Sequence, residues 1–325
     1  MAHLSGLTRL ETLALVGSPI TDEGLRYLKG NESLRTLYLR ESRIRGDGLA
    51  HLAGMDHLEI IGLNDAPLSD EGLTHLPRLP KLWLLKIDGS EVTDRGLAAL
   101  AQQPALSYLS LDRTAITGAG FASFHASTTI ENLSLKGTRC DDSGLAMLAR
   151  FSNLAALSLD ETQITDEGLV HLVSLNQLTR LELISTGVGD RGMIPLADLP
   201  ALETLDLSKT EVGDAGILHL SRMANLKVLH LKGTRVTDAG LPSLAQSTSL
   251  RRLFLNDTAI TDAGLQHLSS LQGLQGLNLR GTHVTPDGVK TLSAALPRCR
   301  IATDWNPAPR RGRFRRPRTS ATAAP

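Results

Sequence analysis

The chain has 325 residues, of which 41% are hydrophobic, 3% are aromatic and 21% are charged, and its formal net charge is zero. No stretch approaches the roughly 18 consecutive apolar residues of a transmembrane helix, and the first residues show neither the basic region nor the apolar run of a signal peptide. We therefore expect no membrane span. The two cysteines, Cys140 and Cys299, are separated by several of the repeats in this sequence, which is too far for a disulfide. Unpaired cysteines favour a reducing, cytoplasmic location.

One sequence pattern recurs every 24 residues along almost the whole chain. Its leading apolar residue falls at Leu10, Leu34, Leu58, Leu82, Leu106, Ile130, Leu154, Leu178, Leu202, Leu226, Leu250 and Leu274. Residues 10–297 are therefore predicted to form twelve repeats in register, and such an array counts as one structural unit. Residues 1–9 match only the end of a unit and are interpreted as an incomplete half-repeat.

The spacing of apolar residues within a unit predicts one short strand and one short helix. In the unit that begins at Leu154, Leu157 and Leu159 occupy positions 4 and 6, the period of two that is typical of a strand with one buried face. Leu169 and Leu172, at positions 16 and 19, have the spacing of a short α-helix or 3₁₀ turn. The strand and the helix should therefore alternate twelve times along the chain.

Three polar or small positions accompany this pattern. Position 13 is usually Asp, as in Asp142, where a helix needs an N-cap or a first-turn acid that accepts hydrogen bonds from unpaired amides. Position 15 is Gly in every unit, and because Gly is a poor helix former, we expect a side chain there to collide with the neighbouring coil. Position 9 is Thr from Thr114 to Thr282, and these hydroxyls should bind backbone groups of the loop.

The two ends of the array differ from its middle. Residues 298–305 are predicted to be a terminal capping strand, with Trp305 covering the last coil. Residues 306–325 contain six arginines and no acid, are predicted to be disordered, and could bind nucleic acid through Arg310–Arg318 or fold back on the acidic centre of the array. No polar cap is evident in residues 1–9, so self-association through this end is another alternative.

The motif resembles the leucine-rich-repeat signature L-x-x-L-x-L-x-x-N-x-L, with Thr in place of Asn. The variant I-T-D-x-G-L-x-x-L is similar to the cysteine-containing-type repeats of F-box substrate receptors and to arrays in some bacteria. The resemblance implies an α/β fold: a right-handed, horseshoe-shaped solenoid with a concave parallel sheet and short convex helices, which usually binds proteins. No F-box segment is present, so a substrate-receptor role in a ubiquitin-ligase-type complex is kept only as an alternative.

Partner-binding residues are expected on the concave face, at positions that alternate with the buried leucines. The centre of this face is predicted to be acidic and its last three units basic, and exposed aromatic residues are the preferred anchors in a chain that has few of them. The candidate residues are Tyr38, Trp83, Lys86, Asp88, Tyr108, Asp112, Asp160, Glu182, Asp206, His230 and Phe254.

Metal binding and catalysis have no support in the sequence. The histidines at position 18 lie on different coils, whereas a metal needs convergent ligands, and one Asp per coil does not give calcium its six or more oxygens. Motifs for nucleophilic, phosphate-binding and zinc-dependent chemistry are absent from the sequence. We therefore predict a non-enzymatic protein-binding module without a cofactor.

Overall fold

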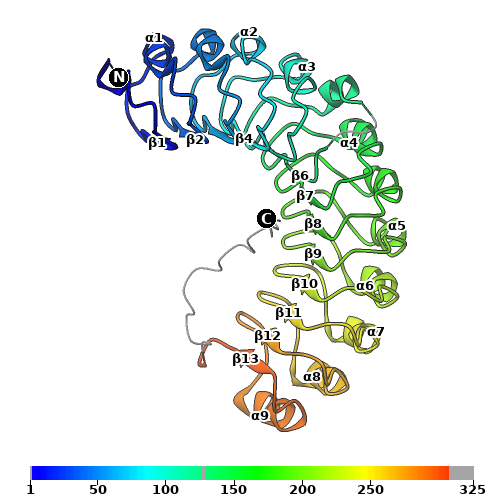
Figure 1. Ribbon diagram of the computed structural model, residues 1–325. Helices are drawn as coiled ribbons and strands as arrows, with labels where there is room; N and C mark the ends of the chain where they lie inside the picture. The colour runs from blue at the N-terminus through cyan, green and yellow to red at the C-terminus, as the bar shows by residue number, and fades with distance from the viewer. Residues whose placement is uncertain (1, 126–128, 307–325) are drawn as a thin grey trace, which may run out of the picture.

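The computed structural model describes residues 2–125 and 129–306, which build one curved array of coils (Figure 1). Within this part of the chain, thirteen strands form a single parallel sheet whose spatial order is the order of the sequence. The strands are β1 (Thr12–Ala14), β2 (Thr36–Tyr38), β3 (Ile60–Gly62), β4 (Leu84–Lys86), β5 (Tyr108–Ser110), β6 (Asn132–Ser134), β7 (Ala156–Ser158), β8 (Arg180–Glu182), β9 (Thr204–Asp206), β10 (Val228–His230), β11 (Arg252–Phe254), β12 (Gly276–Asn278) and β13 (Arg300–Ala302).

The 24-residue period sets the register of the sheet. Leu157 pairs with Leu133 on one side and with Leu181 on the other, each 24 residues away. The middle residue of each strand points into the core, whereas its two neighbours lie on the opposite face, as the burial pattern of β7 illustrates. This face lines the inside of the arc in Figure 1, so the predicted fold class, a solenoid with a concave parallel sheet, is confirmed.

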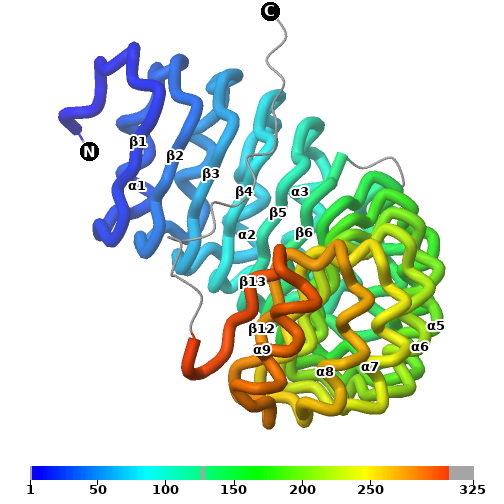
Figure 2. The backbone as a smooth tube through the Cα atoms, turned by 90° about the horizontal axis from the view of Figure 1, so that it is seen from below, coloured from blue at the N-terminus to red at the C-terminus, as the bar shows by residue number. Residues whose placement is uncertain are grey.

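Short helical segments return the chain along the outside of the arc. The α-helices are α1 (Asp22–Leu25), α2 (Asp70–Thr74), α3 (Leu97–Leu100), α4 (Asp142–Leu148), α5 (Met193–Leu196), α6 (Asp214–Leu220), α7 (Leu241–Leu244), α8 (Asp262–Leu268) and α9 (Pro286–Ala295). The 3₁₀ segments are η1 (Ala2–Leu4), η2 (Arg26–Leu28), η3 (Asp47–Leu52), η4 (Ala119–Ser123), η5 (Gly168–Leu172) and η6 (Asp238–Gly240). Figure 2 shows the successive coils side by side. None of the helices in the described residues is long and apolar enough to cross a membrane.

The core is a continuous column of leucines between the sheet and the helices. Leu154, Leu159, Leu169 and Leu172 are fully buried in the seventh coil, and the same positions are buried in its neighbours. Each such side chain contributes about 1.5–3 kcal/mol through burial. The fifth coil is different, because Phe121 and Phe124 replace leucines and pack with a phenylalanine of the sixth coil at ring-centroid distances of 5.7 Å.

The aspartates at position 13 join each coil to the next one. Asp70 is the first residue of α2, as expected for a first-turn acid, but its carboxylate does not cap that helix. It accepts hydrogen bonds from the Thr93 amide (2.7 Å), the Thr93 hydroxyl (2.6 Å) and the Gly96 amide (3.1 Å) of the following coil. Asp70 therefore has one of the two predicted roles, that of a first-turn acid, and Ser69 holds the N-cap of α2.

Close approach of the coils explains the glycine at position 15. A Cβ added to Gly168 would lie 2.2 Å from Oδ1 of Asp142, and one added to Gly264 would lie 2.1 Å from Oδ1 of Asp238. Both distances are far below a van der Waals contact, because each glycine packs against the bridging aspartate of the preceding coil. The predicted collision with the neighbouring coil is confirmed.

The hydroxyls at position 9 bind the backbone inside the turn that follows each strand. The Thr138 hydroxyl donates to the Leu135 carbonyl at 2.6 Å, and the threonines of later coils repeat this bond. The predicted role is therefore confirmed for these threonines. The hydroxyls of Ser42 and Ser90, at the same position in earlier coils, are buried and have no hydrogen-bond partner among the described residues.

The two ends of the array are closed to different degrees. Leu7 and Val16 of the N-terminal coil are 46% and 54% exposed. At the other end, β13 pairs in register with β12, inside the segment predicted to cap the array. Trp305 is 48% exposed, and its role in covering the last coil stays a prediction. The predicted disordered tail after Asn306 lies outside the described residues.

Candidate functional site: the concave face

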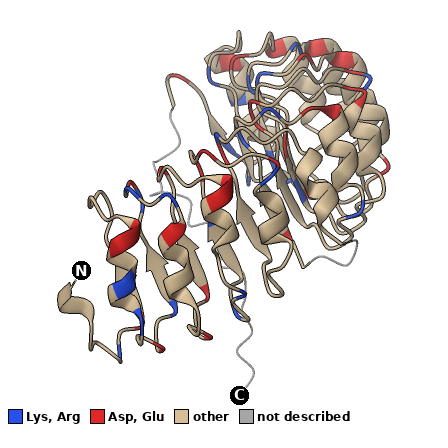
Figure 3. Cartoon of the chain, turned by 90° about the horizontal axis from the view of Figure 1, so that it is seen from above, with Lys and Arg blue, Asp and Glu red and all other residues tan. Residues whose placement is uncertain are grey.

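Seven of the predicted site residues lie on strands of the concave sheet, where their side chains face the inside of the arc. They are half-buried and are listed in chain order as Tyr38, Lys86, Tyr108, Glu182, Asp206, His230 and Phe254. Trp83 is also half-buried and immediately precedes β4. Figure 3 shows that acidic and basic residues are distributed along the coils rather than separated into two poles.

An apolar group occupies the concave surface of β2 to β5. Ile60, Leu84 and Tyr108 are paired in register on three adjacent strands, and Tyr38 lies beside them on β2. The Tyr38 ring covers Gly62, since a Cβ on that glycine would lie 2.6 Å from the ring. We call Tyr38, Ile60, Leu84 and Tyr108 the apolar group.

The structure adds a charged neighbour and one further residue, Ile60, to the apolar surface that the sequence predicted. The Lys86 ammonium lies 5.2 Å from the centre of the Tyr108 ring, a cation–π contact that keeps a charge beside the aromatic surface. Ile60 was not among the predicted residues, although it occupies position 3 of its unit, as Leu84 and Tyr108 do, and that position is the signal that would have identified it. The group is therefore an apolar surface with a charged border.

Three predicted acidic site residues serve a structural purpose. Asp88 and Asp160 are only 8% and 5% exposed. Each lies two residues after the end of its strand, and its side chain enters the space between two adjacent coils. The Asp88 carboxylate accepts hydrogen bonds from the Ser110 hydroxyl (2.5 Å) and the Asp112 amide (3.1 Å). The Asp160 carboxylate accepts one from the Ile184 amide (2.9 Å).

Asp112 repeats the arrangement one coil after Asp88. Its half-buried carboxylate accepts hydrogen bonds from the Ser134 hydroxyl and from the Lys136 amide, the latter at 3.1 Å. Burial is the main reason that the pKa of Asp112 is raised above its usual value, and the nearby Asp88 adds to the effect. These three carboxylates thus connect adjacent coils, and they offer a partner less negative charge than their sequence positions suggest.

Three acidic residues meet at the centre of the face, and two of them, Glu182 and Asp206, are half-buried rather than buried. Glu182 on β8 and Asp206 on β9 are direct register partners, and Asp160 lies at the end of β7 beside them. Burial raises the pKa of Asp160 to about 6, the Ile184 amide opposes the rise, and the negative charges of Glu182 and Asp206 add to it. We call Asp160, Glu182 and Asp206 the acidic row.

An imidazole and a phenyl ring lie next to the acidic row. His230 on β10 and Phe254 on β11 are stacked, with ring centroids 4.1 Å apart and an interplanar angle of 6°. The Nδ1 atom of His230 lies 3.7 Å from a carboxylate oxygen of Asp206. Burial lowers the pKa of His230 and outweighs the opposing effect of Asp206, so the imidazole is mainly neutral at pH 7.

Metal ligation and thiol chemistry have little support among the described residues. Within residues 2–125 and 129–306, no group of three or more His, Cys, Asp and Glu residues could hold a metal ion. Burial raises the pKa of the Cys140 thiol to about 12, which keeps it protonated and unreactive. The concave sheet carries charged and aromatic side chains.

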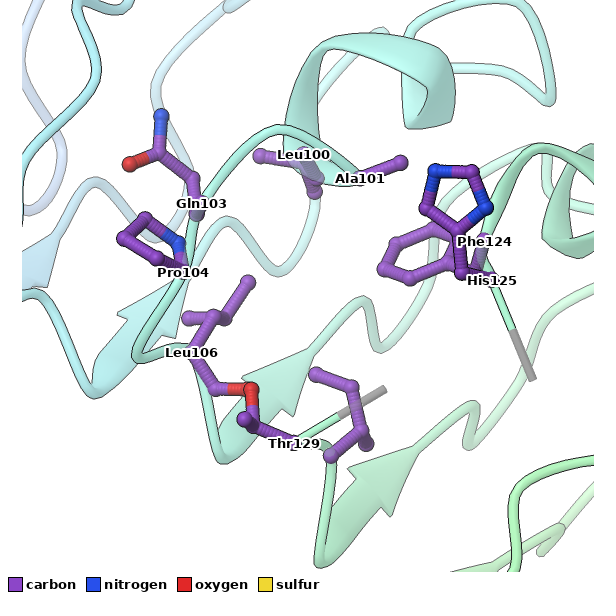
Figure 4. A pocket seen from close by; sticks show the side chains of 9 residues that line it. Leu100, Ala101, Gln103, Pro104, Leu106, Phe124, His125 and Thr129 are labelled. Atoms are coloured by element: carbon purple, nitrogen blue, oxygen red, sulfur yellow. The ribbon is translucent and has the colours of Figure 1, made fainter. Parts of the chain in front are cut away.

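A small cavity lies away from the concave face, between the fourth and fifth coils (Figure 4). Its volume is about 140 Å³, and its lining includes Leu106, Phe124, His125 and Thr129. It borders residues 126–128, which lie outside the described part of the chain. Polar and apolar atoms share its lining about equally.

Comparison with known proteins agrees with the architecture. A family model described as "Leucine Rich repeat" matches residues 7–29, 199–221, 222–245 and 246–269. No curated protein is similar enough in sequence to count as a match.

Two solved structures are similar in fold. An internalin of Listeria monocytogenes is 24% identical with a TM-score of 0.71, and the alignment covers 92% of this chain and 81% of the internalin. A leucine-rich-repeat protein of Leptospira interrogans is 16% identical with a TM-score of 0.52, with coverage of 90% and 81%. At these identities the likeness concerns the fold alone.

Proposed function

We propose that this chain, which is a leucine-rich-repeat protein, is a non-enzymatic module that binds another protein on its concave face. The observation that carries the proposal is the apolar group on β2 to β5. Aromatic residues make up only 3% of the chain, yet two of its three tyrosines lie on this face, on β2 and β5, with Ile60 and Leu84 on the two strands between them. Apolar side chains that are grouped on a solvent-facing sheet gain no stability from contact with water. Their placement on the concave face therefore favours binding.

The physical properties of the face suit a protein partner. Interface hot spots are enriched in tyrosine and tryptophan, which contribute a large contact area at low cost in side-chain entropy. The strands that carry the apolar group are held in register by the backbone and by the Asp88 and Asp112 bridges, so little ordering is required on binding. The acidic row, further along the same face, would add charge selectivity.

A pair of matched leucine substitutions tests the concave face. Leu84→Ala removes an apolar side chain from the apolar group, whereas Leu218→Ala removes one that is 51% exposed on the outer helix α6. Both full-length variants are used as bait beside the wild type, and captured proteins are quantified by mass spectrometry. We expect Leu84→Ala, and more strongly Tyr108→Ala, to weaken capture of the specific partner, by about 30-fold in affinity for a hot spot worth about 2 kcal/mol.

The outcomes of this test are distinct. Leu218→Ala should retain the partner at wild-type abundance. If all variants capture the same proteins in equal amounts, the apolar group is not the binding surface and the proposal fails. Circular dichroism of each variant establishes that the loss of a partner does not come from unfolding.

Self-association through the N-terminal coil is a second candidate, and the exposed apolar residues of that coil favour it. Leu7 and Val16 are exposed, and among the described strands β1 pairs with β2 alone. Light scattering should then give a molar mass above the 34.9 kDa of one chain, and Leu7→Asp should restore that value. In the described residues, no observation favours the ubiquitin-ligase alternative, and the nucleic-acid alternative involves Arg310–Arg318, which lie outside them.

A further inference from the structure

The basic groups around the acidic row do not offset the repulsion among its three carboxylates. Glu182 pairs with Arg180 on the same strand. The Lys136 ammonium lies 3.0 Å from Glu161, at the rim of the sheet. Its charge lowers the pKa of Asp160, but the charge of Glu182 raises that pKa by more. The Nδ1 atom of His230 lies 3.7 Å from the Asp206 carboxylate, and the charges of Arg180 and Arg252 also act on this imidazole.

His230 does not neutralise this charge at pH 7. Burial lowers its pKa, so the imidazole beside Asp206 is mainly uncharged. Like-charge repulsion from Glu182 and Asp206 is also one of the reasons that the pKa of Asp160 is raised. The acidic row would therefore gain from a cation supplied by another segment.

The surface beside the acidic row favours arginine over lysine as that cation. The stacked rings of His230 and Phe254 continue from Asp206 across β10 and β11. A guanidinium can stack on an aromatic face while it binds a carboxylate with two parallel N–H bonds, whereas an ammonium cannot. Carboxylates bordered by flat rings thus match an arginine-rich peptide.

The chain itself contains such a segment. Residues 310–318 read R-R-G-R-F-R-R-P-R, with six arginines, one phenylalanine and no acid. They follow Asn306, whose amide donates to the hydroxyl of buried Thr303 at 3.0 Å, directly after β13. The segment therefore starts from a fixed point on the sheet that carries the acidic row.

The length of the segment is sufficient to reach the row. β9 and β8 lie four and five strands from β13, which corresponds to about 19 and 24 Å at the usual strand spacing. Arg313 and Arg316 lie seven and ten residues after Asn306, so an extended chain could carry them about 24 and 34 Å. Figure 1 shows β8 to β13 along one continuous inner surface.

We propose that the arginine-rich segment Arg310–Arg318 binds the acidic row of its own chain and covers the C-terminal half of the concave face. The arginines pair with Glu182 and Asp206, and one of them stacks on the ring of Phe254. A partner that used this half of the face would have to displace the segment. That regulatory consequence rests on the proposed function above, whereas the intramolecular contact does not.

Limited trypsin digestion of the full-length protein tests the contact without a partner. Cleavage after Arg313 and Arg315 is timed at low ionic strength by mass spectrometry, with a synthetic peptide of residues 306–325 as the reference for an unbound segment. If the segment is bound about 90% of the time, these sites are cleaved roughly 10-fold more slowly in the protein than in the peptide, because cleavage follows the unbound population.

Matched variants assign the protection to the acidic row. The double variant Glu182→Gln, Asp206→Asn removes two charges while it preserves side-chain size, and it should bring cleavage to within about twofold of the peptide rate. Asp198→Asn makes the same chemical change at an exposed residue after α5 and should leave protection unchanged. Raising the salt to 1 M, where the Debye length is about 3 Å, should abolish the protection in the wild type.

Three results would overturn the proposal. One is a wild-type segment that is cleaved at the peptide rate at low salt. Another is protection that persists in the double variant. The third is protection that increases with protein concentration, which would assign the segment to a second copy of the chain. None of these results depends on whether the concave face binds a partner.

Discussion

Replacing Gly168 by alanine should destabilise the protein, although the same change usually stabilises a helix. Gly168 is the first residue of η5, and alanine is favoured over glycine by about 1 kcal/mol in a helix interior. The new Cβ, however, would lie 2.2 Å from Oδ1 of Asp142 in the preceding coil. Either the carboxylate or the coil has to move.

The size of the loss follows from what Asp142 holds. Its carboxylate accepts hydrogen bonds from the Thr165 amide (2.9 Å) and the Thr165 hydroxyl (2.6 Å). Hydrogen bonds to a charged group contribute about 1.5–3 kcal/mol each, and overpacking costs about 1–3 kcal/mol. With one bond weakened and part of the strain relaxed, we expect the free energy of unfolding to fall by about 2–4 kcal/mol.

Urea denaturation followed by circular dichroism measures the global effect, and hydrogen exchange locates it. Amides of the sixth and seventh coils should lose protection first, since a repeat contacts mainly its neighbours. Gly276→Ala is the matched control, because a Cβ there would lie 3.8 Å from the Arg252 side chain and would fit. It should leave stability unchanged or slightly higher.

A second substitution tests the cause of the loss. Asp142→Ala removes the atom that the new Cβ would meet, so the costs of Gly168→Ala and Asp142→Ala should not add, and the coupling should be about 1–2 kcal/mol. A Gly168→Ala protein as stable as the wild type would refute the reasoning. So would an undiminished penalty in the Asp142→Ala background.

Three further predictions concern single side chains. Burial raises the pKa of Asp160 from 3.8 to about 6, so the folded state binds this proton more tightly than the unfolded state does. The stability that protonated Asp160 contributes is therefore lost as the pH rises from 4 to 6. Asp160→Asn should therefore stabilise the protein by about 1–2 kcal/mol at pH 8 and not at pH 4, as measured by denaturation at both values. Thr138→Val should cost about 1 kcal/mol, because the hydroxyl bond to Leu135 is lost, and Thr138→Ser should recover most of it in the same assay. Cys140, which is buried and has a pKa raised to about 12, should react with a thiol reagent at pH 8 only after unfolding; prompt reaction of the native protein would contradict its described burial.

Features that repeat in every unit could be predicted from the sequence. Leu157 and Leu159 alternate with polar residues, and this period of two identifies both the strand and its buried face. The recurring glycine at Gly168 indicates a close approach, because no helix requires glycine at its start. Both predictions depend on local geometry that each coil repeats. A pattern seen in one unit therefore predicts the same structure in the next unit.

The direction of contacts between coils could not be predicted in the same way. A 24-residue repeat places an identical set of amides in each coil, so the sequence does not show whether Asp70 binds its own helix or the next one. Asp88 and Asp160 were placed on the concave face by alternation, but each strand ends after three residues and the chain turns before these side chains. Their carboxylates therefore enter the space between coils, where backbone amides bind them.

The sequence by itself determined the solenoid, its register and its core, because each of these follows from an apolar pattern whose period equals the length of one coil. Only the tertiary structure decided which side chains on the concave face remain available to a partner. The stack of His230 on Phe254 and the burial of Asp160 both depend on side chains from adjacent coils. Such residues are 22 to 24 positions apart in the sequence, and curvature and register alone bring them into contact.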